Sequence, residues 1–264
     1  MAPGHRAGSS TRLLILGCVR LFQPVHGYFI RRELLSWHVD DWAFVHPGSI
    51  YNALRSLTSQ GLLEEVRTSA GGARPARTSY QLTDAGESMF GVLLRDSLSD
   101  PDDAIAFLVA VNFAPSLSRD EVVTLVGEHA DGLRAQVEAA PAALAAFLAR
   151  RDSPPSASET LRLLAARSAG ELSWCEEYLA RVRSGAYAFL GEEPDWVPSE
   201  EQVAEAVAAG AGGGVRDVRA AENGASGTGT RRHGADAGPE VDDLSGPDRS
   251  DRSDGTDGTD GTDA

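Results

Sequence analysis

The chain has 264 residues, with 24 basic and 39 acidic side chains, and a formal net charge of −15 at pH 7. This length permits one large or two small domains, each with a buried core. Cys18 and Cys175 are far apart in apolar helical patterns, which favours buried thiols in a reducing compartment over a disulfide framework. The first apolar run is interrupted at Arg20 and is too short for a membrane span. We therefore expect a cytoplasmic protein.

The charge is unevenly distributed along the chain. Residues 1–95 carry ten arginines against seven acidic residues, a net +3, so the remaining 169 residues carry −18. Every basic side chain is Arg, which binds phosphate or guanine with two donors at once, although a GC-rich genome is the simpler explanation. The acidic balance therefore does not argue against a nucleic-acid partner for the N-terminal part.

Two helices are predicted at the start of the chain. After a flexible leader over residues 1–11, the apolar run 13–22 predicts a mostly buried helix that ends before Pro24. A second helix begins at His26-Gly27. Its expected apolar face consists of Tyr28, Ile30, Leu34 and Leu35.

A connector over residues 38–46, which forms a short strand or closes one side of the core, leads to a third helix. Pro47 suits the first turn of this helix, and Gly61 suits the residue past its end. The helix has an apolar stripe of Ile50, Leu54 and Leu57. Its other face carries the candidate DNA contacts Ser49, Tyr51, Asn52 and Arg55, a slim surface that fits a major groove about 12 Å wide. An ordinary surface helix would show the same pattern.

Two β-prone runs, 62–67 and 78–82, flank a tip rich in Gly, Ala and Pro and predict a hairpin. Three helices followed by a hairpin give the order of a winged helix-turn-helix, here over residues 12–95. Arg74 and Arg77 at the tip are candidate phosphate contacts, because neutralising phosphates supplies sequence-independent affinity. The alternative is an ordinary solvated loop.

Three segments resemble the phenolic acid decarboxylase regulator (PadR) family. They are HGYFIRREL at 26–34, PGSIYNALRSLTSQGLLEE at 47–65 and RTSYQLTDAGE at 77–87. The resemblance is strong over residues 12–95 and weak to about residue 200, and Asn52 departs from the proline that many members have. It implies a helical dimerisation region and a small aromatic or hydrophobic effector bound between the C-terminal helices and the winged domain. Trp174 and Tyr178, four residues apart on one helix, are the candidate effector contacts, with core or interface filler as the alternative.

Residues 96–209 are predicted to be helical. Helix starts are expected at Thr83 or Asp84, at Asp100-Pro101, and at the capping boxes Ser118 to Glu121 and Ser156 to Glu159, with a last short helix over 199–208. The long helix that starts at Ser118 is expected to bury one side, with His129 as a core histidine. That side consists of Val122, Val126, His129, Leu133 and Val137, and Pro141 is expected to kink or end the helix.

The next helix carries a heptad seam, for which we predict dimerisation contacts at Leu161, Leu172, Cys175, Leu179 and Val182. A two-subunit contact is favoured because a winged helix that reads a palindrome needs a twofold partner. Packing against the preceding helix of the same chain is the alternative.

From about residue 210 the chain is polar, with six arginines against twelve acids, and predicts a disordered acidic tail over 210–264. Its DGT repeats lack the spacing of a calcium loop, so we expect no bound metal. The tail's charge motivates the hypothesis that it competes with DNA for the wing.

The sequence therefore predicts a mainly α protein with a winged helix-turn-helix, a helical dimerisation region and a tail. Its expected function is that of a homodimeric repressor of transcription that binds a palindromic operator in double-stranded DNA under the control of an effector. A winged-helix protein-interaction module is the alternative, and a regulator of the multiple antibiotic resistance type is a close variant. No catalytic motif or cofactor site is recognised, so an enzyme is not expected.

Overall fold

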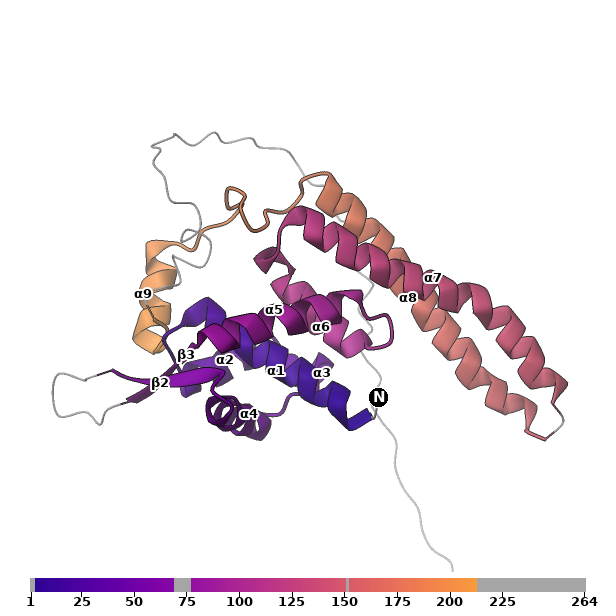
Figure 1. The fold of residues 1–264 in the computed structure, drawn as a ribbon, viewed down its shortest axis with the longest axis horizontal. Helices are drawn as coiled ribbons and strands as arrows, with labels where there is room; N and C mark the ends of the chain where they lie inside the picture. The colour runs from indigo at the N-terminus through magenta and orange to yellow at the C-terminus, as the bar shows by residue number, and fades with distance from the viewer. Residues whose placement is uncertain (1–2, 69–76, 151, 213–264) are drawn as a thin grey trace, which may run out of the picture. The chain divides into compact units, whose positions relative to one another are not determined.

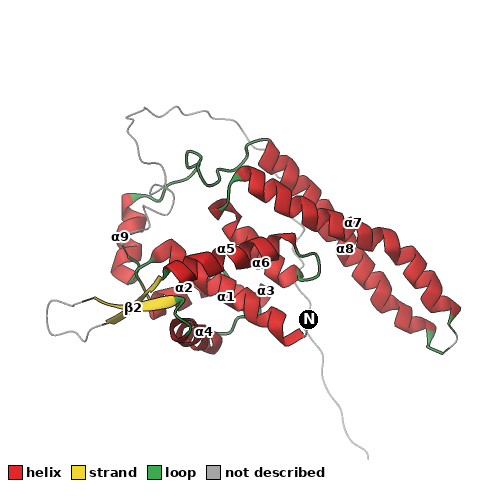
Figure 2. Cartoon of the chain, in the orientation of Figure 1, coloured by secondary structure: helices red, strands yellow, loops and turns green. Residues whose placement is uncertain are grey.

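The computed structural model describes residues 3–68, 77–150 and 152–212. This part of the chain is mainly helical, with one small antiparallel sheet, which confirms the predicted fold class (Figure 1, Figure 2). The tip residues 69–76, including Arg74, and the tail from residue 213 lie outside the described residues.

The N-terminal half forms the winged helix. Its elements are α1 (Pro3–Phe22), β1 (Val25–His26), α2 (Gly27–Ser36), α3 (Val39–Trp42), α4 (Pro47–Ser59), β2 (Leu63–Thr68) and β3 (Arg77–Leu82). The strands are ordered β1-β3-β2, and both pairings are antiparallel. Leu63 pairs with Leu82 and Thr68 with Arg77, as expected for the predicted hairpin. On its other edge β3 pairs with β1, where Val25 faces Tyr80.

Three features of this half differ from the sequence prediction. Helix α1 begins at Pro3, so residues 3–11 are helical and the predicted flexible leader is wrong for them. Proline fits a first helical turn, and Ser10 is buried, but a segment of small and polar residues shows no apolar periodicity. The connector before α4 contains the short helix α3, so four helices precede the wing, and its buried Val45 closes one side of the core, which was one of the two predicted alternatives. Strand β1 is too short for its pattern to be recognised.

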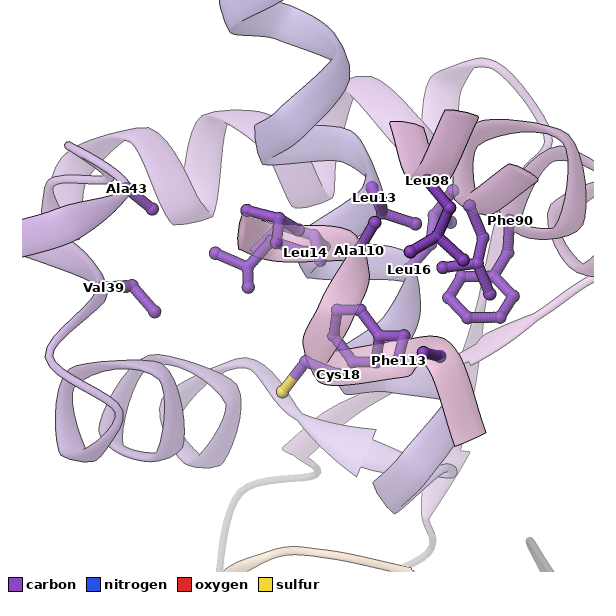
Figure 3. Close-up of a cluster of buried hydrophobic side chains, with 14 of the residues drawn as sticks. Leu13, Leu14, Leu16, Cys18, Val39, Ala43, Phe90, Leu98, Ala110 and Phe113 are labelled. Atoms are coloured by element: carbon purple, nitrogen blue, oxygen red, sulfur yellow. The ribbon is translucent and has the colours of Figure 1, made fainter. Parts of the chain in front are cut away.

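Helix α1 forms the centre of the core. The side chains of Leu13, Leu14, Ile15 and Leu16 are completely buried, as is the Cys18 thiol (Figure 3). Such all-round burial is expected of a helix that lies in the middle of a domain. Helix α6 packs directly on α1 because Gly17 lies under the ring of Phe113, where an added Cβ would be 2.4 Å from the ring. The winged helix and the following helices therefore share one core.

The second half contains α5 (Asp84–Ser99), α6 (Ala104–Phe113), η1 (Ala114–Ser116), α7 (Arg119–Ala149), η2 (Pro155–Ala157), α8 (Ser158–Arg183) and α9 (Glu200–Ala209). Three predicted helix starts are confirmed, because Thr83 and Ser118 cap α5 and α7, and Ser199 forms a capping box with Gln202 in α9. The predicted box at Ser156 is wrong. That residue lies in η2, and the N-cap of α8 is Ala157, which has no capping side chain.

Helices α7 and α8 pack against each other along their lengths as an antiparallel hairpin (Figure 1). Helix α7 continues through Pro141 to Ala149, so the proline does not end it. Pro141 lies in the part of α7 where side chains are mostly exposed. Of the predicted stripe on α7, Val122, Val126, His129 and Leu133 are buried as expected, and Val137 is half-buried.

After α8 the chain returns to the winged helix through residues 186–212, which we call the C-terminal strap. The backbone N–H of Leu190 donates to the carbonyl of Leu117 at 3.1 Å, and the N–H of Gly212 donates to the carbonyl of Phe22 at 2.9 Å. The carbonyl of Gly210, which has a φ of 113°, accepts from the N–H of His26 in β1 at 2.9 Å. A Cβ at Gly210 would lie 2.5 Å from the His26 ring, so glycine is needed both for the backbone angle and for the close approach.

Candidate DNA-binding surface

Helix α4 combines a buried apolar stripe with an exposed polar face. Ile50, Leu54 and Leu57 are buried, as predicted, and attach the helix to α1 and α2. Asn52 and Arg55 are exposed, and Tyr51 keeps 41% of its surface accessible. The structure therefore presents these three predicted contacts on one accessible face, which has the chemistry needed to contact bases and phosphates.

Local hydrogen bonds hold this face in place. The Arg55 guanidinium donates through Nη2 to Oδ1 of Asn52, one turn earlier on the same helix. Ser49 is half-buried, and its hydroxyl donates to the carbonyl of His46 at 2.6 Å, so it closes the first turn and leaves its oxygen to accept. At the other end Gln60 donates to the carbonyl and hydroxyl of Ser56.

Tyrosines from three elements surround the face. Tyr28 of α2, Tyr51 of α4 and Tyr80 of β3 line one hollow. The pKa of the Tyr80 hydroxyl is raised above its ordinary value first by burial and then by Glu65 and Tyr51, while Arg55 lowers it. Gly27 lies beside both rings, because a Cβ there would be in ordinary van der Waals contact with Tyr51 at 3.4 Å and with Tyr80 at 3.5 Å.

Two exposed aromatic residues near α4 were not predicted as contacts. Tyr28 was assigned to the apolar face of α2, yet 62% of it is exposed, and the neighbouring Phe29 fills the core instead. Phe44, just before α4, is 68% exposed and has a φ of 55°, which is strained for a bulky side chain. The HGY motif marks Tyr28 in the sequence, whereas nothing in the local pattern distinguishes Phe44.

Only some of the predicted wing residues can be located. Arg77 is the first residue of β3, and its backbone pairs with Thr68 of β2. Arg74 lies outside the described residues. The strands that lead to the tip are thus placed beside α4, while the two arginine side chains remain sequence-based candidates.

The predicted seam on α8 packs on α7 within the chain, which was the alternative interpretation, and a two-subunit contact stays a prediction. Cys175, Leu179 and Val182 are buried within the chain, and Leu161 and Leu172 are half-buried. Helix α8 makes its most extensive contacts with α7, so packing within one chain accounts for the buried part of the heptad pattern. A heptad seam looks the same in a two-subunit coiled coil and in a helical hairpin, because both bury positions a and d.

The candidate effector residues belong to an aromatic cluster. Trp174 stacks on Tyr178 with ring centroids 4.8 Å apart, and it meets Phe107 of α6 edge-on at 5.8 Å. His129 of α7 also stacks on Phe107 at 3.8 Å, and its Nε2 lies 2.9 Å from Oε1 of Glu171. His129 is fully buried, as predicted for a core histidine. The cluster thus joins α6, α7 and α8, and Trp174 keeps 36% of its surface exposed.

A separate cavity of about 610 Å³ lies between α1, α2, the end of α6 and the C-terminal strap. Phe22, Phe29, Phe113, Phe189 and Trp196 line it. Trp174 and Tyr178 are not among its lining residues. The structure therefore offers a hollow that is separate from the candidate effector residues.

Both cysteines are buried as free thiols. The pKa of Cys18 is raised well above its ordinary value by burial and by Glu33, and burial raises the pKa of Cys175 to about 12. Among the described residues no three His, Cys, Asp or Glu side chains are grouped as metal ligands. None of the described helices has the length and apolar character needed to cross a bilayer.

Residues 15–91, from α1 to the middle of α5, match the Transcriptional regulator PadR-like family. Among solved structures, Bacillus subtilis PadR in complex with operator DNA aligns at 24% identity and a TM-score of 0.30, over 65% of this chain and 98% of that chain. The smu.1604c protein of Streptococcus mutans aligns at 24% identity and a TM-score of 0.30, over 64% of this chain and 98% of that chain. Bacillus subtilis PadR in complex with p-coumaric acid aligns at 20% identity and a TM-score of 0.27, over 69% of this chain and 98% of that chain. No match was found among curated proteins.

Proposed function

We propose that this chain, whose residues 15–91 match the PadR-like family of transcriptional regulators, acts as a homodimeric repressor that binds a palindromic operator under the control of a small-molecule effector. The observation that carries the proposal is the exposed face of α4. Tyr51, Asn52 and Arg55 lie on it beside the strands of the hairpin, while the opposite face of the helix is anchored in the core. A recognition helix needs this combination of a rigid mounting and a free polar surface.

The DNA contacts divide into two kinds. Asn52 and Arg55 are the candidates for reading base edges, and Ser49 and Tyr51 for positioning the helix on the backbone. Arg74 and Arg77 are the proposed phosphate contacts of the wing, and each neutralised phosphate should add about 0.9 to the slope of log affinity against log salt. The wing would therefore supply affinity, and α4 would supply preference for sequence.

Cys175, Leu179 and Val182 of the α8 seam are buried within the chain, which favours another surface for the dimer contact. We propose that a second copy packs on the distal part of this hairpin, where Leu148, Leu163 and Leu164 are 46%, 62% and 52% exposed. Exposed large apolar side chains often mark such contacts. Leu163→Glu together with Leu164→Glu should convert the dimer to monomer in sedimentation experiments. Val92→Glu on α5, where Val92 is 52% exposed, is the matched control and should leave the dimer intact.

DNA binding is tested by fluorescence anisotropy with duplexes from the gene's own promoter region, at about 50 and 200 mM salt with unlabelled competitor. We expect competitor-resistant, salt-sensitive binding that Asn52→Ala and Arg55→Ala weaken. Arg150→Ala, at the exposed end of α7, is the control and should bind like the unmodified chain. A promoter–reporter fusion then tests repression, because loss of the gene should raise reporter output. Absence of specific DNA binding, combined with capture of a protein partner, would favour the alternative of a protein-interaction module.

A further inference from the structure

The cavity beneath the C-terminal strap has the size and lining of a small-molecule site. Its volume of about 610 Å³ is in the range of known ligand pockets, roughly 300 to 1,000 Å³. Aromatic rings come from both sides, with Phe22 and Phe29 on the winged helix and Phe189 and Trp196 on the strap. Trp196 is 63% exposed, so a large apolar surface there has no partner within the described part of the chain. An aromatic ligand would cover it.

The charged groups around the cavity favour a ligand without net charge. Arg20 is engaged by Glu87, at 3.0 Å between Nε and Oε2, and by Ser116. Glu192 is likewise held by Arg119 at 2.6 Å. The other charged side chains that line the cavity are the positive Arg32 and the negative Glu33 and Glu205. A ligand of either sign would therefore meet repulsion as well as attraction, whereas an uncharged molecule avoids the cost of desolvating its own charge.

We propose that this cavity binds an uncharged, largely aromatic small molecule of drug-like size. Rings would pack between Phe29 and Trp196, and Arg32 at the rim, whose guanidinium lies 5.0 Å from the centroid of the Phe29 ring, can donate to a ligand oxygen. The site is built partly by residues 189–206, which lie outside the family match at 15–91. Neither Trp174 nor Tyr178 lines the cavity, so the site is separate from that stacked pair.

The strap gives such a ligand a route to the DNA-binding surface, and this part of the proposal rests on the proposed function. The strap ends in α9 and the anchor at Gly210, which is hydrogen-bonded to β1. Ala208 and Ala209 at the end of α9 line the hollow that Tyr28, Tyr51 and Tyr80 also line. A molecule held between α2 and the strap would thus bias the position of α9 beside α4. By linkage, DNA must change the ligand's affinity by the same factor.

The binding test uses the full chain and N-phenyl-1-naphthylamine, an uncharged aromatic dye that fluoresces in apolar sites. We expect saturable binding with one dye per chain. Ala206→Trp, which fills the cavity from α9, should weaken binding about tenfold or more. Ala204→Trp on the opposite, exposed face of the same helix is the matched control and should leave the dye affinity unchanged. Equal dye binding by the two variants would overturn the proposal.

A second pair of variants locates the dye. Trp196→Ala should weaken dye binding by several-fold, whereas Trp174→Ala should leave it unchanged. The reverse result would place the ligand at the aromatic cluster of α8 and overturn the cavity assignment. Comparison with the anionic dye 1-anilinonaphthalene-8-sulfonate tests the charge argument. Tighter binding of that dye through Arg32, abolished in Arg32→Gln and retained in Arg31→Gln, would overturn the choice of an uncharged ligand.

Dye binding is measured without DNA, so the cavity and the proposed function fail separately. Saturating dye is expected to change the affinity for promoter DNA in the unmodified chain and not in Ala206→Trp. Site-specific dye binding with no effect on measurable DNA affinity would reject the regulatory role and keep the site. Site-specific dye binding by a chain that ignores DNA would contradict the proposed function alone.

Discussion

Gly86, the glycine of the RTSYQLTDAGE segment, lies where the wing meets α5, and its replacement by alanine should destabilise the protein. A Cβ on Gly86 would be 2.0 Å from the carbonyl oxygen of Leu62, closer than the 3.0 Å that real Cβ atoms respect. That oxygen also accepts the N–H of Thr83 at 3.2 Å. The backbone must therefore move by about 1 Å, at an overpacking cost of roughly 1–3 kcal/mol. A weakened hydrogen bond adds about 1 kcal/mol, and the helix propensity of alanine returns about the same.

The net expectation for Gly86→Ala is a loss of about 1–3 kcal/mol in the free energy of unfolding. Gly127→Ala in α7 is the matched control, because a Cβ there has no neighbour within 4 Å. It should gain about 0.5–1 kcal/mol from helix propensity. Urea denaturation followed by far-UV circular dichroism measures both. If Gly86→Ala unfolds at the same urea concentration as the unmodified chain, or a higher one, the close approach at Leu62 is not as described.

Three further predictions concern the surface, the thiols and the helical hairpin. Arg55→Ala should change the free energy of unfolding by less than about 0.5 kcal/mol, because the side chain is exposed, yet weaken DNA binding; parallel losses of stability and affinity would mean a structural role. Ellman's reagent at pH 8 should label neither Cys18 nor Cys175 until the chain unfolds. Rapid labelling of the folded chain would contradict the burial of the thiols. Because burial raises the Cys175 pKa from about 9 to about 12, this group should make the protein less stable as pH rises through that interval. Leu179→Ala, at 5% exposure, should cost about 2–5 kcal/mol, whereas Leu108→Ala on α6, at 47% exposure, should cost little, and equal costs would show that the α8 seam does not pack on α7.

Local patterns were sufficient for the elements that bury a regular stripe. The spacing of Ile50, Leu54 and Leu57 predicted which face of α4 packs on the core. The β-prone runs predicted every end of the hairpin strands within one residue. Caps were predictable where a side chain performs them, as at Thr83, but not where η2 leads into α8. The polar first half of α1 lacked any stripe, so its helix could not be recognised.

The sequence did not predict which segments far apart in the chain contact each other. The spacing of Cys175, Leu179 and Val182 indicates that they are buried, but a periodic seam contains no information on whether α7 or a second subunit covers it. The strap cavity was likewise beyond prediction. It joins residues near 22 and 29 with residues near 189 and 196 through the backbone anchors at Leu190, Gly210 and Gly212, and no periodic pattern encodes those hydrogen bonds.

The most direct test of the central claim is the salt dependence of binding to promoter DNA by the full chain and by Arg77→Ala, with unlabelled competitor present. A dimeric winged-helix regulator should bind a short palindrome specifically. Arg77→Ala should weaken binding to all sequences and lower the salt slope by about 0.9 for each phosphate that is no longer neutralised. Specific binding with an unchanged slope would contradict the wing assignment, and no specific binding at about 50 mM salt would contradict the proposal that this protein is an operator-binding repressor.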